Sequence, residues 1–301
     1  MSQTNLSQPL VLPVEARPVS ADSPFAQALR RFRRHRLAMT GVVIIVVLVI
    51  AALLGSEQAA LSPDLRARNL PPSLEHPFGT DRTGRDVFAR TLVGGRVSLS
   101  VGFVAVFFSL LIGTTLGAIA GYYQGIVDAT IMRLVDIVMC FPLIVLLLSV
   151  VSLLGPGIYK IMVIIGLLTW PTPCRIVRGQ FLSLRQKEYV EAARCIGMSD
   201  LQVAWRHILP NAMAPLLVYA SLGVATAVLL EAGLSYLGLG VQPPTPSWGN
   251  MLNTARSIST MEQTPWQWVP PGICTVLFVL AVNFVGDGIR DAVDPRALER
   301  K

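Results

Sequence analysis

Residues 37–54 read LAMTGVVIIVVLVIAALL, a run without a charged side chain. A helix that crosses the hydrocarbon core of a bilayer needs about 20 mostly apolar residues. The residues directly before it, 30–36, read RRFRRHR, and basic residues beside an apolar run hold that end of the span in the cytoplasm. We therefore expect a first transmembrane helix here and a cytoplasmic N-terminal tail over residues 1–36. Its basic cluster is expected to contact membrane lipid and no nucleic acid.

Five more apolar runs follow. They lie at Val97–Gly121, Ile131–Leu154, Ile158–Trp170, Ala212–Gly240 and Trp268–Gly286. Six spans put both termini on one side of the membrane, and Lys and Arg are more numerous in the segments of that side, which makes it the cytoplasmic one. The sequence thus predicts an all-α integral membrane protein with six transmembrane helices. Residues 37–96 hold the first helix and an external segment, 97–290 a core of five helices, and 291–301 a cytoplasmic end.

The composition agrees with a polytopic membrane protein. Hydrophobic residues make up 52% of the 301 residues and charged residues only 14%, whereas a soluble domain carries about 25% charged residues. None of the four cysteines stands in a C-x-x-C pair, so neither a disulfide framework nor a metal site is expected. These features exclude an ordinary soluble enzyme.

Two features inside the apolar runs predict helix geometry. Gly113, Gly117, Gly121 and Gly125 are spaced by four residues, and small residues at this spacing let another helix approach closely in lipid. Pro142 in the third run removes one backbone donor and is expected to kink that helix.

The segment 174–211, between the fourth and fifth runs, is too polar to span and carries helix signals. Ser183 and Gln186 have the S-x-x-Q spacing of a capping box. We expect a helix to run from there over residues 184–196. Gly197 follows, where a helix stop is expected.

A second set of signals comes directly after this glycine. Ser199 and Gln202 repeat the S-x-x-Q spacing, which predicts a second helix that ends before Pro210. Two helices joined by a glycine elbow would make a folded projection between two spans, and such a projection suggests a docking surface.

The same segment carries a resemblance. Residues 191–193 read EAA, residue 197 is glycine and residues 208–210 read ILP. This pattern resembles the EAA loop of the membrane subunits of ATP-binding-cassette importers. Its position between the fourth and fifth predicted spans, on the basic side, is the position of that loop in the family.

Flanking segments narrow the resemblance to the C-type permeases of dipeptide, oligopeptide and nickel importers. They read HPFGTD (76–81), GRD (84–86), RVSL (96–99), RLVD (133–136), FP (141–142), LGPG (154–157), EAGLSYLGLG (231–240), PSWG (246–249), NFVGDGIRD (283–291) and DPR (294–296). The resemblance covers residues 25–297 and leaves out the polar tail. It implies the fold of a type I importer permease in the cytoplasmic membrane of a bacterium or archaeon.

The resemblance also implies a division of labour. A second, B-type permease subunit completes the pathway, two cytoplasmic ATPases bind ATP and Mg, and an extracytoplasmic binding protein delivers the substrate. This chain is then a non-catalytic subunit without a cofactor of its own. The absence of a G-x-x-x-x-G-K-[ST] motif agrees, because that loop is what holds ATP phosphates in such ATPases.

In the family, the EAA loop fits a groove on an ATPase. By resemblance, Glu191 offers a carboxylate to the ATPase, Ala192 and Ala193 permit close approach, and Gly197 sets the elbow. Glu188 is a further candidate. For both glutamates the alternative is an ordinary solvated charge on an exposed helix.

Two acidic residues lie in or near the apolar runs. An ionisable residue at membrane depth is costly and is a functional candidate by default. Asp136 stands three residues from Arg133, so an ion pair between them is the alternative to a functional contact. Glu231 is expected to line the pathway or to contact the partner permease.

The function expected from these observations is passage of di- and oligopeptides through the membrane. Import of nickel or of another small solute by the same machinery is the alternative. A stand-alone secondary transporter would need no docking loop and often shows internal repeats, which are absent here. An intramembrane enzyme is disfavoured because H-E-x-x-H and G-x-S-x-G motifs are missing.

Overall fold

The computed structural model of the chain describes residues 24–293; residues 1–23 of the predicted tail and 294–301 of the predicted C-terminal end lie outside the described residues. The described elements are all helical. In chain order they are α1 (Pro24–Arg34), α2 (Arg36–Leu54), α3 (Glu57–Leu61), α4 (Val87–Tyr123), α5 (Gly125–Cys140), α6 (Leu143–Leu154), α7 (Ile158–Thr169), α8 (Pro171–Leu184), α9 (Glu188–Cys195), α10 (Asp200–Val203), the π-helical η1 (Ala204–Ile208), α11 (Leu209–Tyr236), α12 (Trp248–Leu252), the 3₁₀-helical η2 (Asn253–Arg256), α13 (Ile258–Gln263), the 3₁₀-helical η3 (Pro265–Gln267) and α14 (Val269–Val293).

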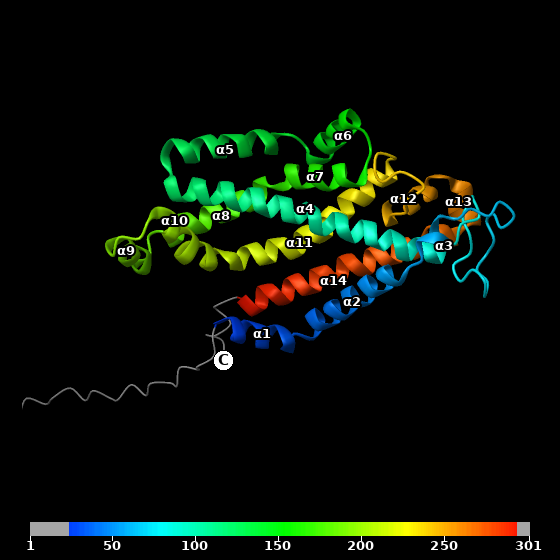
Figure 1. Cartoon of the computed structure of the whole chain (residues 1–301), viewed down its shortest axis with the longest axis horizontal. Helices are drawn as coiled ribbons and strands as arrows, with labels where there is room; N and C mark the ends of the chain where they lie inside the picture. The colour runs from blue at the N-terminus through cyan, green and yellow to red at the C-terminus, as the bar shows by residue number, and fades with distance from the viewer. Residues whose placement is uncertain (1–23, 294–301) are drawn as a thin grey trace, which may run out of the picture.

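The helices form an elongated bundle with α4 and α11 in its middle (Figure 1). In this view α2 and α14 run along one side, and α5, α6 and α7 along the other. α9 and α10 stand at one end, where residues 185–208 are called the projection. α3, α12 and α13 gather at the opposite end, where residues 55–86 and 237–268 are called the cap.

The six-span prediction agrees with the helices. Four unbroken helical segments are long and apolar enough to cross a membrane, and two bent pairs, α5 with α6 and α7 with α8, make six if each pair is one span. α4 begins ten residues before the predicted start of its span, and its 37 residues make a helix about 55 Å long. Because the hydrocarbon core is about 30 Å thick, α4 reaches well beyond it.

The third span is interrupted at Phe141–Pro142, where α5 and α6 meet at 86°. The predicted kink at Pro142 is therefore confirmed, and it is a sharp corner. Pro142 is the N-cap of α6, and the N–H groups of Val145 and Leu146 both donate to its carbonyl.

The fourth span differs from the prediction at its C-terminal end. Residues 174–184, assigned to the polar loop, belong to α8, which continues from α7 after a bend of 40°. Ser183 lies within α8, and the next helix, α9, begins only at Glu188 without a side-chain cap. The capping box predicted at Ser183 is therefore wrong, because packing of α8 on α4 extends that helix past the local signal.

That packing depends on the glycines predicted to admit a close neighbour. A Cβ added to Gly117 would lie 2.5 Å from the backbone oxygen of Cys174, and one added to Gly113 would lie 2.6 Å from Pro173 Cγ. Gly121 meets Phe181 in the same way, at 2.6 Å. The small-residue face is confirmed and its partner is α8.

Gly125 is an exception to the four-residue series. It begins α5 at a φ of +56°, and nothing lies within 4 Å of the position of a Cβ. It serves the turn between α4 and α5.

The sequence predicted that the second helix of the projection ends before Pro210, and this is wrong. α10, η1 and α11 form one helical segment from Asp200 to Tyr236. The N–H of Leu209 donates to the carbonyl of Ala204, five residues back. This π-helical turn shifts the hydrogen-bond register directly before the proline, and proline is tolerated in the first turn of the α-helix that follows.

Two more helix boundaries differ from those predicted from the sequence. Residues 24–34 of the predicted tail form α1. The fifth span ends at Tyr236, because Gly238 takes a φ of +86° and Leu239 N–H donates to Leu234 O. This is a glycine stop of the Schellman type, and the helix therefore ends four residues before the predicted end at Gly240.

Candidate functional site

The projection is attached to the bundle through a small apolar core of its own. Val190, Ala193, Val203 and Ile208 are buried. They cluster with buried side chains of α4, α8 and α11, among them Phe181. The two short helices therefore present one face inward, and that face is fixed by burial.

The elbow between α9 and α10 is closed by glycine geometry. Gly197 has a φ of +84°, a left-handed conformation that favours glycine. The N–H of Met198 donates to Ala193 O and that of Gly197 to Arg194 O, the bond pair of a Schellman motif. The predicted helix stop at Gly197 is confirmed, as is the second capping box, in which Ser199 and Gln202 bond each other's backbone N–H.

Polar contacts tie the projection to the end of α4. Arg185 Nη1 donates to the carbonyl of Tyr122 at 2.7 Å. Tyr122 Oη donates to Asp200 Oδ1 at 2.5 Å. The guanidinium of Arg194 lies over the Tyr122 ring, 5.5 Å from its centre. The projection is thus held against the end of α4 at several points.

The outer face of the projection combines the predicted coupling residues with apolar side chains. Glu188, Glu191 and Ala192 are exposed. Beside them in the chain, Ile196 is 79% exposed and Leu201 is 67% exposed. Trp205 follows at 63%. Three large exposed apolar side chains within ten residues make this segment a candidate for partner binding.

Ala193 requires a correction. The resemblance assigned it to close approach of a partner, but it is only 4% exposed and packs in the core of the projection. Its small size serves packing inside the chain, where it clusters with Val190 and Val203. Of the EAA triplet, Glu191 and Ala192 remain available to a partner.

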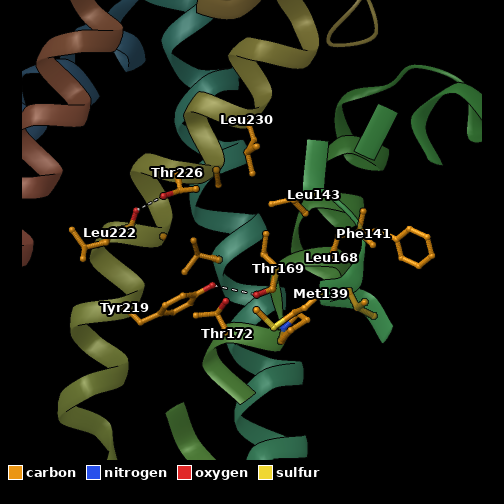
Figure 2. A pocket seen from close by; sticks show the side chains of 15 residues that line it. Met139, Phe141, Leu143, Leu168, Thr169, Thr172, Tyr219, Leu222, Thr226 and Leu230 are labelled. Atoms are coloured by element: carbon orange, nitrogen blue, oxygen red, sulfur yellow. Dashed lines mark hydrogen bonds between the residues drawn. The ribbon is translucent and has the colours of Figure 1, made fainter. Parts of the chain in front are cut away.

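A second candidate site lies where the broken spans meet. A cavity of about 410 Å³, called the chamber, is bounded by α4, α11 and the two helix breaks. Figure 2 shows α11 on one side and α5 to α8 on the other, with Tyr219 pointing across to Thr169. Its polar side chains are all neutral: Thr169, Thr172, Tyr219 and Thr226.

The chamber fits a passage for a solute. Discontinuous helices at membrane depth place free backbone groups beside a water-filled cavity, which is how many transporter sites are built. Among the described residues that line it, none is charged. Within residues 24–293, no cluster of His, Cys, Asp or Glu could hold a metal ion.

Sequence reasoning missed the chamber. Its signal was present in Pro171 and Pro173, two prolines directly after an apolar run that was noticeably short. Interrupted hydrophobic segments are the sequence mark of such sites.

Asp136 forms an ion pair, but with a different partner from the one its spacing predicted. Arg175 Nη2 lies 2.6 Å from Asp136 Oδ1, and both side chains are about half exposed, at 48% and 49%. The pair joins α8 to α5, as does the pair between Arg178 and Asp128. Asp136 therefore holds the corner formed by the broken spans, and Arg133 takes no part in it.

Glu231 is placed where neither predicted role applies. Its side chain is 0% exposed in the single chain. Oε1 accepts hydrogen bonds from Ser235 at 2.6 Å and Ser247 at 2.9 Å, and Oε2 accepts one from Ser98 at 3.1 Å. A carboxyl enclosed by three hydroxyls of its own chain fixes α4, α11 and the cap to one another.

Largely buried charges pair where the cap meets α4. Asp81 Oδ2 lies 2.8 Å from Arg85 Nε and 3.5 Å from Arg90 Nε. Arg90 also donates to the carbonyls of Ala60 and Pro244. Burial would raise the pKa of Asp81, but hydrogen bonds from Thr83 and Arg85 and the charge of Arg85 together hold that pKa below its ordinary value. The ionised carboxylate is therefore the form that the cap stabilises.

Two protein-family models match the chain. Residues 113–299 match the family described as binding-protein-dependent transport system inner membrane component. Residues 23–72 match the N-terminal TM domain of oligopeptide transport permease C.

Relatives match over nearly their whole length. A putative peptide permease protein of Brucella suis biovar 1 is 48% identical, with 92% of this chain and 93% of that protein covered. The dipeptide transport system permease protein DppC of Alkalihalophilus pseudofirmus is 40% identical over 98% of this chain and 99% of its own. The glutathione transport system permease protein GsiD of Escherichia coli O6:K15:H31 is 42% identical over 96% and 95%.

The fold is similar to that of a solved transporter. A chain of the inward-facing MetNI methionine ABC transporter superposes with a TM-score of 0.53. The match has 22% identity and covers 68% of this chain and 96% of that one. At that identity the likeness concerns the fold.

Proposed function

Because the chain belongs to the family of binding-protein-dependent transport system inner membrane components, we propose that it is a permease subunit that imports di- and oligopeptides. It forms the pathway together with a second, B-type permease subunit. Two cytoplasmic ATPases bind ATP and Mg and drive the transport, and an extracytoplasmic binding protein delivers the cargo. The names of the relatives, which include peptide, dipeptide and glutathione permeases, support the cargo class.

The projection is the proposed ATPase-docking element, and one observation carries this assignment. Its inner face is buried and tied to α4, while Ile196, Leu201 and Trp205 are exposed within the same short segment as the exposed Glu191. A rigid element with an uncovered apolar surface is suited to bind a partner and to transmit its motion. Glu191 then offers the partner a carboxylate, and Ala192 leaves room beside it.

The proposed orientation puts the termini and the projection in the cytoplasm and the cap outside, in a bacterial or archaeal cytoplasmic membrane. Cysteine labelling tests it in a Cys-free background with Leu70→Cys in the cap and Lys187→Cys in the projection, since both positions are exposed. A membrane-impermeant reagent should reach the two sites from opposite sides. Labelling of both from the same side contradicts the orientation.

Uptake by the complete transporter tests the function. Proteoliposomes that hold this chain, its partner permease and the ATPases should accumulate a labelled dipeptide. They should do so only when ATP is supplied to the ATPases and the binding protein is present. Uptake of nickel ions instead of dipeptide supports the alternative cargo. Dipeptide uptake by this chain alone, without ATPases, would identify a secondary transporter and contradict the proposal.

A further inference from the structure

Two prolines remove backbone donors where α7 meets α8. In a helix, the N–H of residue i+4 donates to the carbonyl of residue i. Residues 171 and 173 are prolines and have no N–H, so the carbonyls of Leu167 and Thr169 have no helical donor. The carbonyl that follows Thr169, that of Trp170, keeps its donor in Cys174 N–H at 3.1 Å.

Tyr219 of α11 supplies the donor that Thr169 lacks. Its hydroxyl oxygen lies 3.3 Å from the carbonyl oxygen of Thr169 and 3.3 Å from Ser109 Oγ. A phenol has one proton, so when Tyr219 donates to Thr169, the Ser109 hydroxyl donates to Tyr219. The bond crosses the chamber from α11 to α7 (Figure 2).

Both hydrogen bonds are long. O–H···O bonds are usually about 2.7–2.8 Å, so a bond of 3.3 Å is weak and easily exchanged for another. The carbonyl of Thr169 is therefore a hydrogen-bond acceptor at the wall of the chamber, and the Tyr219 hydroxyl holds it through a weak bond.

We propose that the carbonyl of Thr169 accepts the peptide-bond N–H of the cargo during passage, and that the Tyr219 hydroxyl occupies this acceptor when cargo is absent. The inference rests on the proposed peptide cargo. The chamber is lined by neutral groups, so recognition in it depends on hydrogen bonds rather than on ion pairs. A peptide N–H taken from water needs an acceptor, and the exchange keeps both groups paired.

The proposal predicts how the permease discriminates between a dipeptide and its analogue methylated on the peptide nitrogen. The methylated analogue has no peptide N–H, so in the wild type Tyr219 stays on Thr169 while it passes. In Tyr219→Phe no hydroxyl remains, and only the unmethylated peptide can pair the carbonyl. The uptake ratio of dipeptide to analogue should rise about two- to tenfold, the effect of one hydrogen bond.

A second variant should change the ratio in the opposite direction. Pro173→Ala restores an N–H opposite the carbonyl of Thr169, which then finds its donor inside the helix. The acceptor is lost to the cargo, and the uptake ratio should fall below the wild-type ratio. Because both variants and the wild type use the same binding protein, its own preference cancels when the ratios are compared.

Tyr159→Phe is the matched control, since Tyr159 lies on α7 and is 82% exposed; its ratio should equal that of the wild type. The complete transporter, reconstituted with its binding protein, is measured in each case. The inference is overturned if the uptake ratios of Tyr219→Phe and Pro173→Ala both equal the wild-type ratio. It is also overturned if the uptake ratio of Tyr219→Phe falls below the wild-type ratio. If Tyr219→Phe does not assemble, the uptake ratio of Pro173→Ala decides: a fall supports the inference, and an unchanged or higher ratio overturns it.

The outcome separates the inference from the proposed function. Dipeptide uptake by the wild type with unchanged ratios in the variants rejects the role of Thr169 and leaves the cargo class in place. A wild-type complex that hydrolyses ATP and takes up no dipeptide rejects the cargo class, and the inference with it.

Discussion

The two ends of the bundle are built on opposite principles. At the cap, one group of charged side chains is largely buried and paired, that of Asp81 with Arg85 and with Arg90 of α4. In the projection, the charges of Glu188 and Glu191 are exposed and large apolar side chains are uncovered beside them. The paired charges of the cap group find their partners within one chain, whereas the two glutamates of the projection face solvent.

This difference separates stability from partner binding. A buried charge that loses its partner destabilises the chain that contains it, with no other subunit involved. An exposed apolar side chain contributes little to the fold of its own chain and much to an interface that covers it. Changes in the cap should therefore lower the free energy of unfolding, and changes in the projection should lower affinity for the ATPase.

The largest effect is expected from Asp81→Ala in the cap. The change leaves two arginines without their carboxylate, and Arg90 is 5% exposed, so unfolding free energy should fall by about 3–5 kcal/mol. Thermal or denaturant unfolding of the purified complex measures it. Glu57→Ala is the control, because Glu57 pairs with Arg96 while 67% exposed, and it should cost less than about 1 kcal/mol. Equal losses in the two variants would mean that the cap is not held by buried charge.

The same carboxylate gives the cap a pH dependence. The pKa of Asp81 is lowered from 3.8, so its contribution to stability is complete above that pH and is lost as the pH falls through the lowered value. Wild type and Asp81→Asn should therefore differ most in stability at neutral pH and converge well below pH 3.8. A gap that persists in acid would show that the ionised form is not what the cap stabilises.

The next largest effect is expected at the projection, from Trp205→Ala. The side chain is 63% exposed, so the free energy of unfolding should change by less than about 0.5 kcal/mol. A buried interface tryptophan is worth about 2 kcal/mol or more, so the ATPase should bind about 30-fold more weakly in a pull-down titration or by calorimetry. Tyr159→Ala, at an exposed site on α7, is the control. If Trp205→Ala left ATPase affinity unchanged and lowered the free energy of unfolding, Trp205 would serve the fold of this chain and not partner binding.

Gly117→Leu tests the seam that joins the projection to the bundle. The side chain would meet the backbone of Cys174 at 2.5 Å, and forced overpacking costs about 1–3 kcal/mol. We expect loosened packing of α8 on α4, faster hydrogen exchange in the projection, and no change in the cap. Gly179→Leu is the control, because nothing lies within 4 Å of that position. Normal exchange in both variants would mean that the seam is not tight.

The elements that sequence alone predicted are those with local causes. The corner at Pro142, the stop at Gly197 and the cap at Ser199 each follow from one residue's own backbone or side-chain chemistry. They are confirmed without knowledge of any distant contact.

Two of the misses have distant causes. Residues 174–184 looked too polar for a span because of Arg175 and Arg178, but these pair with Asp136 and Asp128 of α5, about forty to fifty residues away. Glu231 looked free because two of its three hydroxyl partners, Ser98 and Ser247, come from other elements. Which charges are neutralised is a property of the packed bundle, so the sequence could not place them.

The smallest effect is expected from Glu191→Ala, the change nearest to the resemblance that first indicated an importer. Glu191 is exposed, so its removal leaves the fold intact. If its carboxylate receives a charge-assisted hydrogen bond from the ATPase, binding should weaken about tenfold. The measurement is ATPase affinity together with substrate-stimulated ATP hydrolysis by the assembled complex.

Glu188→Ala provides the comparison for this last change. Both glutamates lie in the first turn of α9 and are exposed, so general loss of negative charge affects the two variants alike. A specific contact affects Glu191→Ala and spares Glu188→Ala. If both variants keep full affinity and full coupled hydrolysis, both carboxylates are solvated surface charges. The apolar side chains around Trp205 would then supply the whole attachment, and the projection would differ from the cap in being bound through apolar contact alone.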